Sequence, residues 1–170
     1  MVAVFTLVGL PALGHVTVEV DNPEPEGFAV YTVRVPNESD TGSTTKVELR
    51  IPEGLEASRY QPKPGWTMGI EDGVLTIEGG AIAPGQFDEF RFQARNPDAS
   101  GPISFAAIQT YDDGDVVNWT GESGSDSPAS VVEIGSGGDG SGGDSRLTIT
   151  ALIVGSLGLV AGAMALLRTR

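Results

Sequence analysis

The sequence contains no cysteine, one histidine and three methionines among its 170 residues. Without cysteine there is neither a disulfide nor a thiolate cluster. The methionines lie in three different segments, so the chain offers no group of the soft sulfur ligands that hold copper(I). His15 is the only histidine, so it is the only candidate for the histidine base of a hydrolytic nucleophile–histidine pair. A metal site in this chain would therefore use nitrogen and oxygen donors and favour an oxidised ion.

Basic residues are also scarce, with 10 Lys and Arg against 23 Asp and Glu and a net charge of −13. This balance argues against nucleic acid or anionic lipid as a partner and makes cations the natural ligands. Taken alone, the same charge equally fits the solubility of a cell-surface domain.

The first 14 residues have the layout of a signal peptide. An apolar run over residues 2–10 is broken by Pro11, and Ala12 and Gly14 supply the small residues that a signal peptidase reads. This predicts a cut between Gly14 and His15. The segment departs from the usual pattern because it has no Lys or Arg, and the alternative is that it stays attached as a first strand or an anchor.

The predicted cut would make His15 the first residue of the mature protein. An N-terminal histidine offers its α-amine and its imidazole to one metal ion, and two nitrogen donors in one residue suit copper(II) best among the common divalent ions. The residues alone therefore predict a copper(II) chelate at His15.

The C-terminal part of the chain has the pattern of a membrane anchor. Residues 147–167 form 21 uncharged positions, which as a helix would rise about 31 Å and span a bilayer core of about 30 Å. Arg168 and Arg170 place the tail, residues 168–170, in the cytoplasm. A flexible linker of Gly, Ser and Asp is predicted over residues 135–146, which leaves one folded domain, residues 15–134, on the extracellular side of the cell membrane.

The folded domain is predicted to be all-β. Apolar residues recur with a period of two, and turn signals separate the runs. The alternating positions include Val16, Val18 and Val20; Ala29, Tyr31, Val33 and Val35; Val47 and Leu49; Phe90 and Phe92; and Ile103, Phe105 and Ala107. Seven to nine short strands fit a two-sheet immunoglobulin-like sandwich, followed by the linker and a single transmembrane helix.

Several segments together resemble one known family. They are His15-Val16-Thr17-Val18, Val35-Pro36-Asn37-Glu38-Ser39, Gln61-Pro62-Lys63-Pro64-Gly65-Trp66, Pro84-Gly85-Gln86-Phe87, Gln109-Thr110-Tyr111-Asp112 and Asn118-Trp119-Thr120-Gly121. In order and spacing the sequence is similar to the YcnI-like family of membrane-anchored bacterial copper-binding domains. The resemblance covers residues 15 to about 134 and the tethered C-terminal helix.

The resemblance implies a sandwich that binds one copper(II) per chain. Its mature N-terminal histidine chelates the ion, a glutamate is a further ligand and a tryptophan stands beside the metal. Carried over by position, these residues are His15, Glu38 and Trp119. The resemblance also implies copper homeostasis or trafficking, with copper transporters or metallochaperones as candidate partners.

A rough strand register agrees with this set. A hairpin that turns about Glu24 would pair residues whose numbers sum to about 48, which sets His15 opposite Val33 and Glu38 just past the strand end. Asp40 is the nearest rival ligand. Trp119 is expected either in the core or with its ring facing the metal, and the other tryptophan, Trp66, is expected to pack against the sheet.

Three classes of function remain open from the sequence. The first is a copper(II)-binding module that captures or delivers the ion, and we expect no enzyme activity. The second is a copper oxidase or oxygenase, which is disfavoured because oxygenases built on an N-terminal histidine use a second histidine. The third is an adhesive or structural cell-surface domain with an incidental histidine.

Overall fold

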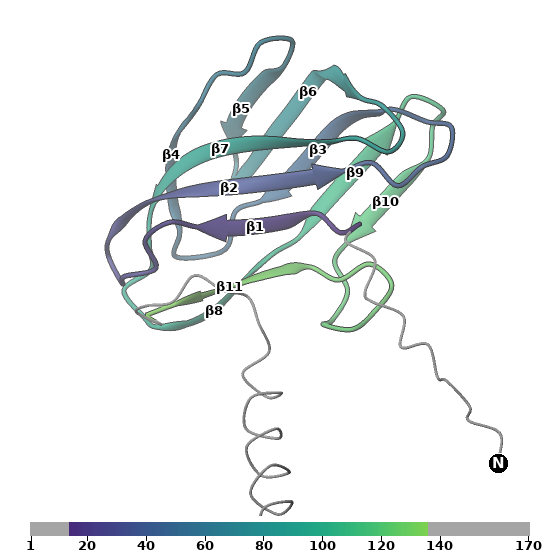
Figure 1. Cartoon of the computed structure of the whole chain (residues 1–170). Helices are drawn as coiled ribbons and strands as arrows, with labels where there is room; N and C mark the ends of the chain where they lie inside the picture. The colour runs from purple at the N-terminus through teal and green to yellow at the C-terminus, as the bar shows by residue number, and fades with distance from the viewer. Residues whose placement is uncertain (1–13, 136–170) are drawn as a thin grey trace, which may run out of the picture. The chain divides into compact units, whose positions relative to one another are not determined.

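A computed structural model describes residues 14–135 of the chain (Figure 1). In this part the chain forms eleven β-strands, and no helix in it is long and apolar enough to cross a membrane. The predicted cut lies at the start of the described part. The predicted transmembrane helix, the cytoplasmic tail and all but the first residue of the predicted linker lie outside it.

One layer is a four-stranded antiparallel sheet in the order β1-β2-β7-β4. Its strands are β1 (Thr17–Val20), β2 (Phe28–Pro36), β7 (Phe87–Arg95) and β4 (Glu56–Tyr60). The pairing of β2 with β7 extends over nine residues, from Phe28 opposite Arg95 to Pro36 opposite Phe87.

The other layer is a five-stranded antiparallel sheet in the order β10-β9-β3-β6-β5. Its strands are β10 (Val116–Trp119), β9 (Ala107–Tyr111), β3 (Thr44–Arg50), β6 (Val74–Ile82) and β5 (Thr67–Glu71). The two layers make the predicted all-β sandwich (Figure 1).

A small third sheet pairs β8 (Gly101–Phe105) with β11 (Ser130–Ile134). The alternating run around Phe105 is thus two strands, because at Ala106 the chain leaves β11 and continues as β9 beside β3. The amide of Arg50 donates a hydrogen bond to the carbonyl of Ala106 at this switch. β11 is joined to β1 by the bond from the Val18 amide to Ser130 Oγ, 2.8 Å.

The core forms where the inward positions of the two layers meet. The period of two holds on β2, β3 and β7, whose inward residues are fully or nearly fully buried: Ala29, Tyr31, Val33, Val35, Val47, Leu49, Phe90, Phe92 and Ala94. Tyr31 stacks on Phe92 with ring centroids 5.2 Å apart. The same alternation makes position 109 of β9 an inward position, although it is occupied by glutamine.

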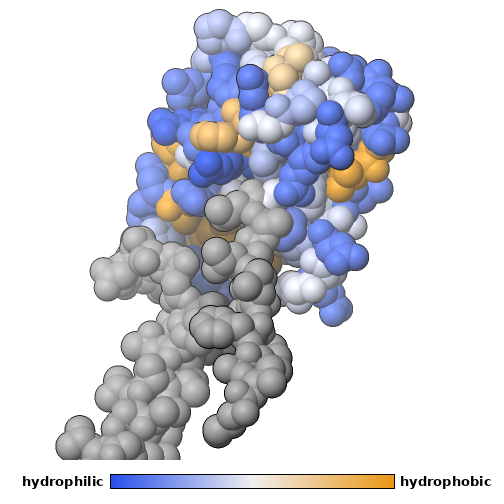
Figure 2. Space-filling view, turned by 45° about the vertical axis from the view of Figure 1, so that its right-hand side comes forward, coloured by the Kyte–Doolittle hydropathy of each residue, from blue (hydrophilic) through white to orange (hydrophobic). Residues whose placement is uncertain are grey.

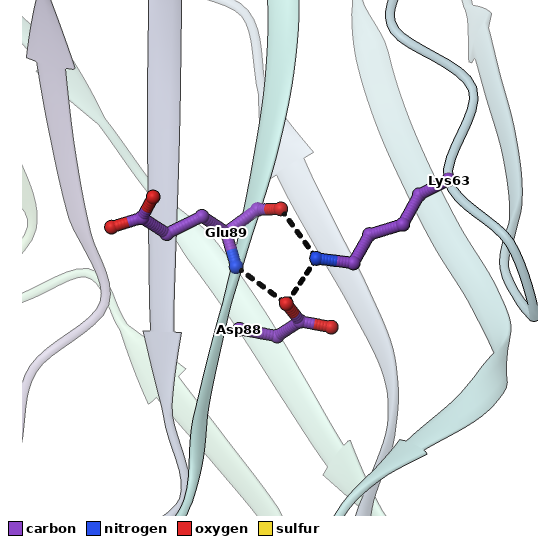
Figure 3. Close-up of polar contacts among 3 residues, drawn as sticks. All are labelled: Lys63, Asp88 and Glu89. Carbon is purple, nitrogen blue, oxygen red and sulfur yellow. Dashed lines mark hydrogen bonds and ion pairs between the residues drawn. The ribbon is translucent and has the colours of Figure 1, made fainter.

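Trp66 packs against the core, as predicted. Its ring meets Phe90 edge to face at 5.0 Å. Figure 3 shows how the preceding loop is fixed: Lys63 Nζ contacts Asp88 Oδ1 and donates to the carbonyl of Glu89 at 3.0 Å, and the Glu89 amide donates to the same Asp88 oxygen at 2.9 Å. In the Pro-Lys-Pro-Gly-Trp segment, Lys63 and Trp66 therefore hold the loop against β7.

The register of the first hairpin differs from the predicted one. Paired residues of β1 and β2 have numbers that sum to 51, as in Val18 opposite Val33. The turn is centred between residues 25 and 26 and not at Glu24. Within it Glu26 adopts a left-handed conformation, φ 57°, and the amide of Gly27 donates to the carbonyl of Glu24. Continued to the start of the chain, the observed register brings His15 opposite the end of β2.

The surface of the described residues is largely hydrophilic. In the view of Figure 2 the apolar residues form small separate patches among blue ones. The large exposed hydrophobic side chains, Phe28, Tyr60, Phe87, Ile108, Val116 and Val131, come from six different strands. The exposed apolar side chains are therefore spread over the strands of the sandwich.

Candidate metal centre

His15 lies directly before β1, against the last residue of β10. Its imidazole meets the indole of Trp119 edge to face, with ring centroids 5.5 Å apart and the ring planes inclined by 66°. Figure 1 shows the start of β1 beside the arrowhead of β10. Two of the three residues named from the sequence are thus in contact, although 104 positions separate them in the chain.

Trp119 lies in the core, which is one of the two positions that the sequence left open, and its ring also contacts His15. It is only 4% exposed. An indole buried on one side and facing the histidine on the other forms a fixed wall beside the imidazole.

Glu38 reaches the same place from the loop between β2 and β3. A β-carbon added to Gly14 would overlap the Glu38 carboxylate, whose atoms are the nearest to that position apart from Gly14 and its chain neighbours. Gly14 is the residue whose carbonyl forms the peptide bond to His15, so the carboxylate lies beside the position that the predicted cut would convert into a free α-amine. The side chain of Asp40 is not among these nearest neighbours.

A buried asparagine fixes the loop that carries Glu38. Asn37 is 4% exposed, and its Nδ2 donates to the carbonyls of Gly42 and Ile82 at 2.8 and 2.7 Å. Its Oδ1 accepts a bond from the amide of Ser39 at 2.8 Å. Both ends of the side chain are used inside the fold, so the backbone on either side of Glu38 is held in place.

Trp119 is held from behind by Gln109, a residue for which the sequence analysis assigned no role at the site. The Trp119 Nε1 donates to Gln109 Oε1 at 2.9 Å, and Gln109 Nε2 donates to the carbonyl of Pro36 at 2.9 Å and to Thr44 Oγ1 at 2.7 Å. Gln109 and Thr44 are fully buried. A polar residue at an inward strand position was the available signal for this network.

The loops around the site are acidic. The segment before β3 is joined to the segment after β9: the amide of Ser43 donates to Asp112 Oδ1, and Thr41 Oγ1 donates to Asp113. Burial raises the pKa of the Tyr111 phenol, the Thr44 hydroxyl lowers it by a smaller effect, and the negative charges of Glu38 and two aspartates raise it further. A cation at this end of the sandwich would be in a negative field.

Within residues 14–135, no three His, Asp or Glu side chains come together in a group that could hold a metal ion. Side chains alone therefore supply at most an imidazole and one carboxylate here. The third donor of the predicted site is not a side chain but the α-amine of His15. The uncut chain has a peptide bond there.

Comparisons with known proteins identify relatives of this chain. The profile of the family described as "Domain of unknown function (DUF1775)" matches residues 15–78 and 73–134. A relative, the copper-binding protein CutI of Bacillus subtilis (strain 168), is 32% identical over 181 aligned residues that cover 94% of this chain and 88% of the relative.

A solved structure is also similar. An uncharacterized protein from Nocardia farcinica, described as having an immunoglobulin-like fold, is 32% identical, with a TM-score of 0.63 over 71% of this chain and 97% of that one. This match confirms the predicted immunoglobulin-like sandwich.

Proposed function

The chain belongs to the DUF1775 family, in agreement with its predicted resemblance to the YcnI-like domains, and from that premise we propose that it is a membrane-anchored copper(II)-binding protein. In this proposal it captures or delivers one copper(II) per chain outside the cytoplasm, through the amine and imidazole of a mature N-terminal His15. The name of its relative, a copper-binding protein, supports the choice of metal.

One observation carries the proposal: the Glu38 carboxylate packs against Gly14, the residue that the predicted cut removes, while Trp119 packs against the ring of His15. Removal of Gly14 would leave the carboxylate beside a new amine. The cut would therefore create both the nitrogen donor and the space for an ion between that donor and Glu38.

The donor set fits copper(II). An amine nitrogen, an imidazole nitrogen and a carboxylate oxygen are the borderline and hard donors that stabilise the oxidised ion, and the sequence contains no thiolate that would favour copper(I). Both nitrogens must be unprotonated to bind, so affinity should fall as the solution is acidified.

The proposed location follows from the sequence outside the described residues. The apolar run at 147–167 would anchor the domain, the linker at 135–146 would tether it, and the arginines at 168 and 170 would remain in the cytoplasm. A tethered domain of this kind suits exchange of copper with membrane transporters or metallochaperones.

We favour a carrier over an oxidase or oxygenase because the chain has one histidine, and over an adhesive domain because the histidine contacts a buried tryptophan. The test begins with N-terminal sequencing of protein extracted from membranes, which should start at His15. Protein starting at His15 should then bind one equivalent of copper(II) against a competing chelator, and His15→Ala protein should not. Stoichiometric binding by the His15→Ala protein would contradict the proposal.

A further inference from the structure

We propose that Gln109 is a positioning residue for the copper site: it holds the Trp119 indole against His15 and ties it to the strand end that leads to Glu38. This inference rests on the proposed function for its metal role. The placement of Trp119 by Gln109 does not depend on copper and can be tested on the copper-free protein.

The geometry gives Gln109 three partners on three different strands. It accepts from Trp119 Nε1 on β10, and it donates to Thr44 Oγ1 on β3 and to the Pro36 carbonyl at the end of β2. β2 belongs to one layer of the sandwich, and β3 and β10 belong to the other. One side chain therefore joins the two layers directly behind the candidate site.

A primary amide, which carries both an acceptor and a donor, satisfies these partners. The indole N–H requires an acceptor and the Pro36 carbonyl requires a donor, so the amide orientation is fixed by its partners. At full burial, an apolar replacement would leave both groups without a hydrogen bond, and a carboxylate would set an acceptor against the Pro36 carbonyl.

The bond to Pro36 connects Gln109 to the metal-facing side chains. Pro36 is followed by Asn37, which is pinned by its own buried hydrogen bonds, and then by Glu38. The bond to Trp119 acts on the ring that touches His15. The side-chain hydrogen bonds of Gln109 go to Pro36, Thr44 and Trp119, so its effect on copper would be transmitted through Pro36 and Trp119.

The fold supplies a matched control in Asn96. This residue is also a buried amide, 3% exposed, which accepts from the Tyr31 hydroxyl at 2.6 Å and donates to the carbonyls of Asn22 and Glu24, both at 2.8 Å. It lies near the Phe28 end of β2, whereas Gln109 bonds the Pro36 end. Loss of either amide breaks one hydrogen bond to an aromatic side chain and two other hydrogen bonds. Only the amide of Gln109 lies beside the candidate site.

The experiment uses mature protein with Trp66→Phe as the parent, so that emission reports Trp119 alone. Gln109→Met and Asn96→Leu should both lower the melting temperature. Only Gln109→Met should shift the emission and near-ultraviolet dichroism of Trp119 in the absence of copper. Only Gln109→Met should also lower the affinity for copper(II), by about 10-fold, which is the lower end of the range for loss of a residue that orients metal ligands. If Gln109→Met does not fold, the isosteric Thr44→Val should change both readouts in the same direction by less.

Unchanged emission in both Gln109→Met and Thr44→Val would overturn the placement of Trp119 by Gln109. An equal loss of copper affinity in Asn96→Leu would overturn the specific role, because general destabilisation would then explain the effect. A parent that binds no copper would overturn the proposed function and with it the metal role of Gln109, while the copper-free emission would still decide whether Gln109 positions Trp119.

Discussion

The imidazole of His15 stands edge to face against the indole of Trp119, at a centroid distance of 5.5 Å. The tryptophan is at the end of an edge strand and almost wholly buried, so its ring has little freedom to turn away. The histidine therefore has a fixed aromatic neighbour, and the carboxylate of Glu38 lies against the residue that precedes it.

This contact makes Trp119 a reporter of copper(II), which quenches nearby indole fluorescence. With His15 as the ligand, Trp66→Phe protein should lose most of its emission on addition of one equivalent of copper(II), because the remaining indole touches the ligand. Trp119→Phe protein should be quenched much less, since Trp66 packs on Phe90 in a different part of the sandwich. Quenching confined to Trp66 would place the bound copper elsewhere.

Variants of Glu38 and Asp40 distinguish a carboxylate that binds copper from one that only adds to the negative charge around the site. Both carboxylates are exposed on the same loop, but the three heavy atoms nearest to a β-carbon added at Gly14 all belong to Glu38. We expect Glu38→Gln to weaken copper(II) by about 10- to 100-fold, which corresponds to about 1.4–2.8 kcal/mol, and to change its paramagnetic resonance spectrum. Asp40→Asn should change affinity by less than about 3-fold. Equal losses in a chelator competition would assign the effect to the acidic surface.

Reduction distinguishes a carrier from an oxygenase. Donors of nitrogen and oxygen without sulfur hold copper(I) poorly, so ascorbate should lower the amount of bound copper. Oxygen uptake, followed with an electrode, should not exceed that of the released ion. Sustained oxygen turnover by protein that keeps its copper when reduced would favour the oxygenase.

Tyr31 gives the fold a dependence on alkaline pH that is independent of copper. Burial, and then the charge of Asp21, raise the pKa of its phenol to about 12 from an ordinary value of 10.0. Because the folded pKa is the higher one, its contribution to stability is complete below pH 10.0 and is lost as the pH rises toward 12.

We therefore expect wild-type protein to lose about 2 kcal/mol more than Tyr31→Phe protein between about pH 9 and 11.5 in urea unfolding. We also expect Tyr31→Phe to be less stable than wild type at neutral pH, because Asn96 loses a hydrogen-bond donor. Parallel pH profiles for the two proteins would show that the phenol is not buried as described.

Much of the fold follows from the alternation of residues. The inward positions of β2, β3 and β7 were identified from a period of two, because one face of each strand is buried in the sandwich. The break at Ala106 was not predicted, since Phe105 and Ala107 are both inward and the pattern does not show that the strand changes partners.

The site was predictable in its residues more than in its geometry. His15 followed from the predicted cut, whereas Glu38 and Trp119 came from family resemblance. The predicted hairpin register was wrong by three residues, because the turn is centred after Glu24 and the left-handed backbone of Glu26 is not signalled by its side chain. Gln109 was missed because hydrogen bonds to Pro36 and Trp119 depend on packing between the layers, which sequence periodicity does not encode.

The central claim is that the free amine of His15 binds the metal. Copper(II) affinity should be compared between protein that starts at His15 and protein that retains residues 10–14. The extension is long enough that His15 is not the second or third residue, where its imidazole could chelate copper together with the new N-terminus. Because the chelate joins two donors in one residue, we expect the extended form to bind about 100-fold more weakly or worse in competition titration. Equal affinity of the two forms would contradict the account.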